Sequence, residues 1–182
     1  MSLVNIQLID SYTLGAAIDL LESQMREHDI VISRADLQAA TQKLMSDRRY
    51  GFMLVATTSD EGPIGVAYAS SILSLEHGGI SGWLEELYVL PKWRGQGIGS
   101  RLIAEVVAVA KEAGWRALDL EVEASHQRAI SLYTRHQFQP RSRSRFYRSI
   151  APPLACAPPR FKLRNRENTP QSPEPLFCKS RS

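Results

Sequence analysis

The segment that most constrains the fold lies near the middle of the chain, where a glycine-rich stretch separates two apolar runs of different periodicity. The sequence reads "WLEELYVL" over 83–90, then "PKWRGQG", then "IGSRLIAEVVAVAKEAG". The first run has the length and residue types of a β-strand. The second repeats apolar residues such as Leu102 and Val106 at helical spacing, and Gly114 supplies a stop. The segment therefore predicts a strand, a glycine-rich turn and a helix.

A turn of this kind is suited to binding an anion. Its backbone N–H groups point into one concavity, and the helix N-terminus adds partial positive charge. Glycine accepts positive φ angles and has no Cβ to keep an anion at a distance. The dinucleotide fingerprint G-x-G-x-x-G fails because Ser100 stands three positions after Gly97, and no G-K-[ST] of a P-loop follows. We therefore expect a phosphate or pyrophosphate cradle that belongs to neither nucleotide-binding class.

The remaining sequence up to residue 150 predicts a mixed sheet with helices packed on its faces. Further strands are predicted at 4–9, 51–58, 63–73 and 116–123, with a final pair over 138–150. Further helices are predicted after an Asp10 cap, at 33–45 behind a Ser33 cap, and from a Ser125 cap to His136. The order β-α-α-β-β-β-α-β-α-β-β indicates an α/β fold, more closely an α+β mixed sheet.

Composition changes near residue 150. The chain has 182 residues, which suits one compact domain with a remainder, and residues 151–182 hold seven of the ten prolines. That segment also carries six Lys or Arg against two Glu, so the basic character belongs to it rather than to the body. We predict one domain over 1–150 and a Pro-rich basic extension over 151–182 without a core of its own. Because no aromatic residues interleave with its charges, a nucleic-acid partner is not expected.

Cysteine usage and hydropathy narrow the class of protein. Cys156 and Cys178 both lie in the extension, so we expect neither a disulfide nor a cysteine-rich metal site in the body, and no metal. No apolar run approaches the roughly 18 residues that a membrane span needs, and the N-terminus lacks the pattern of a signal peptide. We therefore expect a cytoplasmic protein without a membrane partner.

Two segments together resemble one known family. The pattern Arg94-x-x-Gly97-x-Gly99 after "LEELYV" resembles the acyl-CoA pyrophosphate loop of the GNAT superfamily of N-acetyltransferases. "LEVEASHQRAISLYTRHQF" is similar to a strand and helix of that family, including a tyrosine at Tyr133. The resemblance covers roughly residues 4–150.

Two positions depart from the family pattern. His126 stands where the family usually has Asn, although its ring can still donate a hydrogen bond to the cofactor. Gln137 replaces a glycine that often ends the helix with a positive φ, so we expect the local turn to differ.

The resemblance implies a central sheet that splays between the strands at 83–90 and 116–123, with acetyl-CoA as cosubstrate in the gap. Backbone groups freed by such a splay need partners. The family pattern implies that the main chain of the first strand binds the pantetheine arm and that the loop amides hold the pyrophosphate, with added charge from an arginine. The implied cofactor-binding residues are Leu87, Tyr88, Val89, Arg94, Gly95, Gln96, Gly97, Ile98, Gly99, Ser100 and His126.

The activity implied by the resemblance is transfer of acetyl to a primary amine by direct attack on the thioester. The family pattern places Tyr133 to protonate the departing sulfur, while Glu85 and Glu121 match bases of two different branches. Either base is expected to work through ordered water. Glu86 is adjacent to Glu85, so on a regular strand the two face opposite sides, and a solvated or ion-paired role is expected for Glu86.

The sequence leaves the acceptor and one alternative class open. A peptide N-terminus, a polyamine, an aminoglycoside and a small amino acid all remain candidate acceptors, and a homodimer is open because similar proteins are commonly dimers. The alternative to an enzyme is an acyl-CoA-binding sensor or interaction module of the same fold. An acid and a thiol-protonating group in one cleft would favour the enzyme.

Overall fold

The computed structural model describes residues 3–142. The predicted final strand pair begins inside this range, but residues 138–142 form no helix or strand, and the remainder of the pair lies outside the described residues. The predicted domain boundary near residue 150 and the Pro-rich segment after it also lie outside them.

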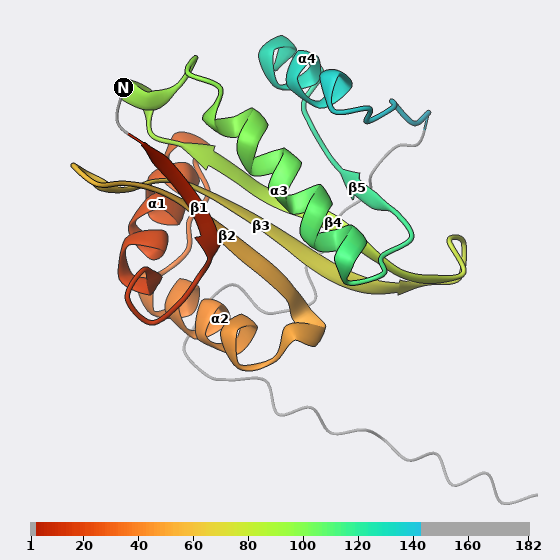
Figure 1. Cartoon of the computed structure of the whole chain (residues 1–182), viewed down its shortest axis with the longest axis horizontal. Helices are drawn as coiled ribbons and strands as arrows, with labels where there is room; N and C mark the ends of the chain where they lie inside the picture. The colour runs from red at the N-terminus through yellow and green to blue at the C-terminus, as the bar shows by residue number, and fades with distance from the viewer. Residues whose placement is uncertain (1–2, 143–182) are drawn as a thin grey trace, which may run out of the picture. The chain divides into compact units, whose positions relative to one another are not determined.

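Five strands form one mixed sheet, as the sequence predicts. The strands occur in chain order across the sheet, and β1 to β4 pair antiparallel while β4 and β5 are parallel (Figure 1). This arrangement confirms the predicted fold class. The strands are β1 (Val4–Leu8), β2 (Gly51–Thr58), β3 (Gly62–Ser74), β4 (Gly79–Val89) and β5 (Leu118–Leu120).

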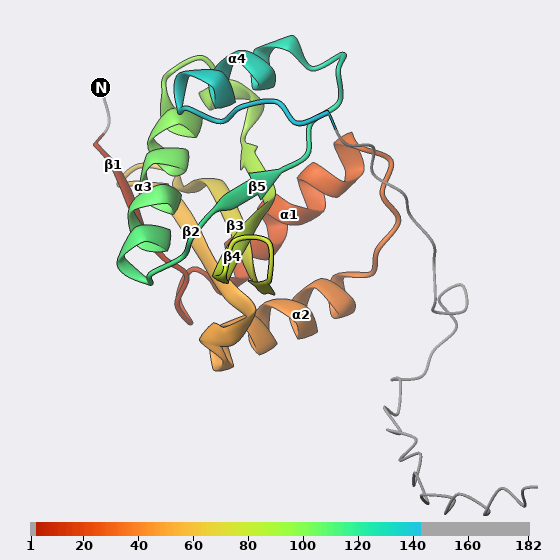
Figure 2. The same cartoon turned by 90° about the vertical axis from the view of Figure 1, so that its right-hand side faces the viewer.

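Helices cover both faces of the sheet. Figures 1 and 2 show α1 and α2 on one face and α3 on the other, with α4 following β5. Apolar residues of β2 alternate between these faces, since Leu54 packs in the core under α3 and Val55 in the core under α1 and α2. The alternation follows from the period of two along a strand. The helices are α1 (Leu14–Glu27), α2 (Arg34–Ser46), α3 (Ile98–Glu112) and α4 (Gln127–Arg135).

The helix starts agree only in part with the predicted caps. Ser33 is the N-cap of α2, and its hydroxyl accepts a hydrogen bond from the Asp36 N–H at 3.1 Å. The predicted Asp10 cap is displaced by one turn, because Thr13 is the N-cap of α1 and the Asp10 carboxylate accepts from the Thr13 N–H at 2.8 Å. The predicted Ser125 cap of α4 is wrong, since the helix begins one residue later behind His126 without a side-chain cap.

The sheet opens between β4 and β5. Strand β5 has three residues rather than the predicted eight, and its pairing with β4 runs from Gly82 opposite Leu118 to Leu84 opposite Leu120. The following segment of β4, Glu85–Val89, has no partner in β5. Its outer edge therefore presents main-chain N–H and C=O groups that a ligand can pair with. This is the geometry that the predicted splay requires.

Candidate active site

The glycine-rich loop leads into α3 with the backbone that its sequence predicts. Gly95 and Gly97 have φ angles of 78° and 80°, and Gly97 is the N-cap of the helix. A Cβ added at either glycine would meet nothing within 4 Å, so both positions border open space. Because the first intrahelical hydrogen bond to Gly97 comes from the Arg101 N–H, the amides over 98–100 point out of the helix end. These features fit a pyrophosphate group.

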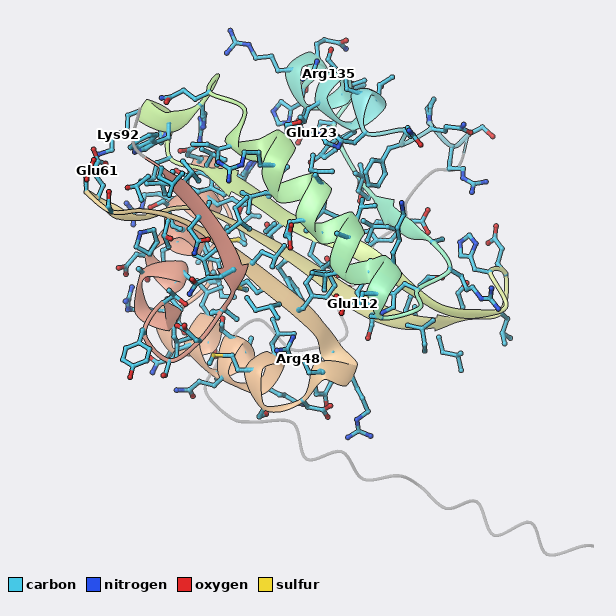
Figure 3. The ribbon with its side chains drawn as sticks, in the orientation of Figure 1. Arg48, Glu61, Lys92, Glu112, Glu123 and Arg135 are labelled. Carbon is cyan, nitrogen blue, oxygen red and sulfur yellow. The ribbon has the colours of Figure 1, made fainter. Side chains whose placement is uncertain are left out.

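The loop is anchored to the sheet by its own side chains. Lys92 forms an ion pair with Glu61 beside the β2–β3 turn, where Figure 3 labels both side chains. The Trp93 indole also donates to Glu61, at 3.1 Å. Ile98 is buried in the core at the start of α3. These contacts hold the loop amides in place, so little conformational entropy remains to be lost on binding.

Arg94 occupies a different position from the one expected for a phosphate ligand. Its Nε donates to the Val89 carbonyl at 2.8 Å, and its Nη2 donates to Glu27 at 2.7 Å. Tyr88 donates to the same carboxylate at 2.7 Å, and this bond, followed by the one from Arg94, lowers the pKa of Glu27. In this structure Arg94 therefore ties the loop to the end of α1.

A β-bulge shapes the open part of β4. Tyr68 of β3 pairs with Glu86, and the next residue of β3 pairs with Leu84, so Glu85 is the extra residue. A bulge breaks the simple alternation of side chains. The expectation that Glu85 and Glu86 face opposite sides is therefore wrong, because Leu84 and Leu87, which flank them, both pack in the core under α3. Glu85 accepts a hydrogen bond from Ser70 at 2.8 Å. Burial raises the pKa of Tyr68, and the charges of both carboxyls raise it further.

Glu86 is the carboxyl with the most altered environment in the site. Burial raises its pKa from the ordinary 4.5 to about 7, with a further increase from the charge of Glu85. The Gln24 amide of α1 donates to it at 2.6 Å and opposes part of that increase. A carboxyl with this pKa is close to equally populated in its two protonation states at neutral pH, which suits a general base.

Tyr133 is held on α4 by a well-formed helix end. The Phe138 N–H donates to the Tyr133 carbonyl and the Gln137 N–H to Thr134, at 3.1 and 3.0 Å, which is a Schellman motif. The Phe138 ring packs on Tyr133 with centroids 5.9 Å apart. Gln137 adopts a φ of 67°, so the expectation that this turn differs from the glycine form is wrong.

The Tyr133 hydroxyl has a raised pKa because of its surroundings. Burial raises its pKa, and the charge of Glu86 raises it further. A phenol that keeps its proton at neutral pH can give that proton to a leaving group.

The other predicted site residues on β4, after β5 and before α4 do not gather at one point. Leu87 and Val89 pack toward the core under α3, whereas Tyr88 is buried toward α1. The main chain of all three pairs with β3 and has no partner in β5. Glu121 directly follows β5 and is exposed. His126 is also exposed, and its ring meets that of His28 edge-on at 6.0 Å.

Other contacts near the loop come from its polar residues. The Gln96 amide donates to the Lys92 carbonyl at 3.1 Å, and the Ser100 hydroxyl lies 2.6 Å from Nε2 of His136. Gly99 is close to α4, since an added Cβ would lie 3.5 Å from Leu132. The start of α3 is thus joined to α4 as well as to the sheet.

Sequence reasoning missed Gln24 and gave Glu86 a minor role. One signal was available: Gln24 stands three residues after Leu21 and seven after Ala17, on the buried face of α1. A polar amide within an apolar stripe is unusual enough to mark a partner. The bulge that turns Glu86 toward it has no signal in the sequence of β4 alone.

Comparison with known proteins identifies the family. The acetyltransferase (GNAT) family matches residues 17–138, which is more than half of the chain. The chain belongs to the GNAT acetyltransferase family. This confirms the resemblance drawn from the loop and from the segment around Tyr133.

Individual relatives agree with that assignment. A thialysine N-epsilon-acetyltransferase of Bos taurus is 39% identical over 82 residues, 44% of this chain and 48% of its own length. The Mus musculus protein of the same name is 41% identical over 51 residues, 28% of this chain and 30% of its length. The chain thus spans about half the length of the first curated relative and less of the second.

Solved structures show the same GNAT fold. An aminoglycoside N-acetyltransferase in complex with CoA matches with a TM-score of 0.71 and 21% identity, covering 83% of this chain and 97% of that one. An integron cassette protein from a salt-marsh metagenome matches with a TM-score of 0.72 and 21% identity, covering 81% and 91%. At this level of identity the likeness concerns the fold alone.

The described part of the chain shows neither a metal-ligand cluster nor a membrane-spanning helix. Within residues 3–142, no group of three or more His, Cys, Asp or Glu side chains is arranged to hold a metal ion. Over the same range, no helix has the length and apolar character needed to cross a membrane.

Proposed function

We propose that this GNAT protein transfers the acetyl group of acetyl-CoA to a small primary amine. The observation that carries the proposal is the position of Glu86: a partly buried carboxyl with a pKa of about 7, on the part of β4 that β5 leaves unpaired. The thioester of a coenzyme paired with that edge would lie beside this base. Acetyl-CoA supplies the activated acetyl group when it binds.

The residues present fit such a coenzyme. The positive φ angles of Gly95 and Gly97 and the open space beside them leave room for the pyrophosphate, and the amides over 98–100 are its donors. The open edge over 85–89 suits the two amides of the pantetheine arm, which can pair with it as an added strand does. Arg94 contributes by fixing the loop, because its guanidinium is already paired with Glu27.

Glu86 acts as the base in this proposal. A primary amine is protonated near neutral pH, and it becomes a nucleophile only after it loses one proton. The ionised fraction of Glu86 takes that proton, directly or through one ordered water. Glu85 is one of the two bases that the family pattern implies. It accepts a hydrogen bond from Ser70 and raises the pKa of its neighbour, so in this proposal it supports the base rather than replacing it.

Tyr133 acts as the acid, and a main-chain amide stabilises the oxyanion. The nitrogen attacks the thioester carbon, and the developing negative charge on oxygen is met by an N–H of the open segment near Val89. The carbon–sulfur bond then breaks and the thiolate receives the proton of Tyr133. Tyr133 carries this proton at neutral pH because a phenol ionises only at about pH 10. The nitrogen loses its second proton as the amide forms, and that proton returns through water to the Tyr133 phenolate, while Glu86 releases the first proton to solvent.

The names of the relatives support one class of acceptor. The relatives are named for acetylating the side-chain amine of thialysine, and a structural neighbour is an aminoglycoside N-acetyltransferase. Thialysine and the aminoglycosides are both small polar molecules that carry a primary amine. We propose an acceptor of this class, with thialysine as the first compound to test.

The test combines binding with turnover. Calorimetry of the full chain with acetyl-CoA is expected to give a 1:1 complex, and thiol release is expected to require thialysine or L-lysine. Tyr133→Phe should slow thiol release by about 100-fold without weakening acetyl-CoA binding. Tight binding without turnover on any of a panel of amines would support the acyl-CoA sensor instead, and absence of binding would overturn both.

A further inference from the structure

Glu27, the last residue of α1, uses both of its carboxylate oxygens on side chains from the proposed coenzyme site. Oε1 accepts a hydrogen bond from the Tyr88 hydroxyl, and Oε2 accepts one from Nη2 of Arg94, each at 2.7 Å. The Arg94 guanidinium also lies over the Tyr88 ring, 5.3 Å from its centroid. One carboxylate that the sequence pattern did not indicate therefore holds two of the predicted coenzyme-binding residues.

The backbone pairing of β4 shows where the main-chain groups of Val89 point. The Leu90 N–H donates to the Ile64 carbonyl at 2.9 Å, so these two residues form a hydrogen-bonded pair of the antiparallel ladder with β3. In such a ladder, hydrogen-bonded pairs alternate with pairs whose N–H and C=O groups point away from the partner strand. Val89, opposite Gly65, belongs to the second kind. Its N–H and C=O therefore face the open edge of β4.

Arg94 occupies one of these two groups. Its Nε donates to the Val89 carbonyl at 2.8 Å, while Glu27 holds its Nη2. The carbonyl is thus engaged by a charged donor of the protein itself, so the N–H is the group of Val89 that remains for a coenzyme. A coenzyme atom that pairs with Val89 is then a hydrogen-bond acceptor, such as a carbonyl oxygen.

The same guanidinium lies at the entrance of the glycine-rich loop. Gly95 and Gly97 follow it with φ angles of 78° and 80°, and an added Cβ at either would meet nothing within 4 Å. A glycine backbone can take many conformations unless the segment is held at its ends. Arg94 holds one end, and Ile98, which is buried in the core, holds the other. A fixed Arg94 therefore lowers the entropy that the loop loses when a pyrophosphate binds.

We infer that Glu27 is a positioning residue of the acetyl-CoA site and acts through Arg94. The inference rests on the proposed function, and it adds a residue that neither the loop pattern nor the family likeness indicated. Glu27 holds the guanidinium that engages the Val89 carbonyl and fixes the loop entrance. Its loss should therefore weaken coenzyme binding rather than slow the chemical step.

A competing role for Glu27 has the opposite sign. If Arg94 turned to the phosphates when the coenzyme binds, the carboxylate would compete with them for the guanidinium, and its removal would tighten binding. The geometry favours positioning, because that turn would break two hydrogen bonds, one to Glu27 and one to Val89. The direction of the change in acetyl-CoA affinity therefore separates the two roles.

The test compares Glu27→Gln with Glu22→Gln, a matched change on the same helix at a glutamate that pairs with Arg34 of α2. A glutamine has one acceptor oxygen, so it cannot accept from both Tyr88 and Arg94. In calorimetry of the full chain with acetyl-CoA, the Kd of Glu27→Gln should rise by about 3- to 10-fold, the size expected when one side chain must be ordered on binding. The kcat with thialysine at saturating acetyl-CoA should stay within about twofold. Glu22→Gln should match the wild type in both.

Two further measurements distinguish positioning from a general structural role. The side chains of Glu27 and Arg94 are 39% and 48% exposed, so their ion pair should contribute little to stability, and the urea midpoint of Glu27→Gln should lie near that of the wild type. Arg94→Gln should weaken acetyl-CoA binding at least as much as Glu27→Gln does. Adding Glu27→Gln to it should have no further effect, because Glu27 acts through Arg94.

A conservative variant keeps the inference testable if Glu27→Gln folds poorly. Glu27→Asp retains the charge and both acceptor oxygens on a shorter side chain, so its Kd should lie between those of the wild type and Glu27→Gln. If the wild type binds acetyl-CoA and the Glu27 variants bind it equally well or more tightly, the inference is wrong. It is also wrong if the effects of Glu27→Gln and Arg94→Gln simply add. If the wild type binds no acetyl-CoA, the proposed function itself fails.

Discussion

The two halves of β4 differ in packing and in chemistry. In the first half, Gly82 to Leu84 pair with β5, and the ring of Trp115 lies directly on Gly82. The second half begins at the bulge, has no partner in β5 and carries Glu85 and Glu86. The first half holds the two strands together, and the second leaves their backbone groups available. One strand thus provides both the hinge of the opening and one wall of the site.

The first half of β4 marks the point at which β4 and β5 begin to separate. Separating two strands exposes main-chain groups, so it needs a fixed point from which the separation begins. Trp115 provides that point, because it packs on Gly82 and also on Phe52, with ring centroids 5.2 Å apart. The bulge then adds twist at the next residues. Changes in the first half should therefore affect stability, and changes in the second should affect chemistry.

The largest effect is expected from Glu86→Gln in the open half. The amide keeps the shape of the side chain and can still accept a hydrogen bond from Gln24, but it cannot take a proton. We expect kcat for thialysine to fall by about 100- to 10,000-fold, the range of a lost general base. In the wild type, kcat/KM should fall as the pH drops below about 7, since the base must be ionised. Both expectations are checked by measuring kcat and kcat/KM against pH for the wild type and for Glu86→Gln.

Glu85→Gln is the matched control for that prediction. It removes the neighbouring carboxylate and is expected to cost less than about 10-fold, while moving the acidic limb to lower pH because a like charge no longer raises the pKa of Glu86. If Glu85→Gln proves the more damaging change, the base is Glu85, and the bulge does not bring Glu86 to the reacting amine.

The next effect is expected from Gly82→Ala in the paired half. An added Cβ would lie 2.0 Å from the Trp115 ring and 2.9 Å from Leu118, so the ring must move. Overpacking of this kind typically costs about 1 to 3 kcal/mol of unfolding free energy, and the short contact places this site at the upper end. Urea unfolding measures the loss. Trp115→Leu in the same chain should recover part of it, because the smaller side chain leaves room for the methyl group.

Gly15→Ala serves as the control for this change. Nothing lies within 4 Å of a Cβ at Gly15, which is in the first turn of α1, so alanine should leave stability unchanged or raise it slightly. A Gly82→Ala protein as stable as the wild type would show that the contact with Trp115 does not fix the opening.

A smaller effect is expected in the pH dependence of stability. The pKa of Glu86 is about 7 in the folded chain against an ordinary value of 4.5, so the folded state binds its proton more tightly than the unfolded state does. The resulting stability is fully present below pH 4.5 and is lost as the pH rises through about 7. With allowance for solvent screening, we expect about 2 kcal/mol. The unfolding free energies of the wild type and Glu86→Gln, compared between about pH 5 and pH 8, should diverge by this amount with the wild type losing more.

Much of this fold could be predicted because its signals are local. The bounds of β2 and the Ser33 cap of α2 depend on residues within a few positions of one another, and both agree with the structure. The positive φ angles of the loop glycines follow from the residue type in the same way. Contacts between distant segments gave no such signal. The bulge at Glu85 depends on the register with β3, and the bond to Gln24 joins residues 62 positions apart.

The site was therefore predicted in outline but not in detail. Local pattern and family likeness brought together the loop, the open strand and Tyr133. They could not show that Arg94 is engaged by Glu27, since that pairing depends on where α1 ends relative to the loop. They also treated Gln137 as a reason for a different turn, whereas the packing of Phe138 on Tyr133 favours the same turn. Tertiary contacts thus overrode the preference of a single residue.

The smallest effect concerns that turn, which holds Tyr133 against the open half. Gln137 has a φ of 67°, a left-handed conformation that costs a residue with a Cβ about 1 kcal/mol. Gln137→Gly should remove that strain and keep the Schellman bonds, so we expect it to raise the unfolding free energy by up to about 1 kcal/mol. Gln137→Val, which is β-branched, should lower it. Urea unfolding measures both, and the kcat of Gln137→Gly should stay near that of the wild type. A glycine variant less stable than the wild type would mean that the glutamine side chain itself supports the helix end, and that Tyr133 is positioned by more than the turn.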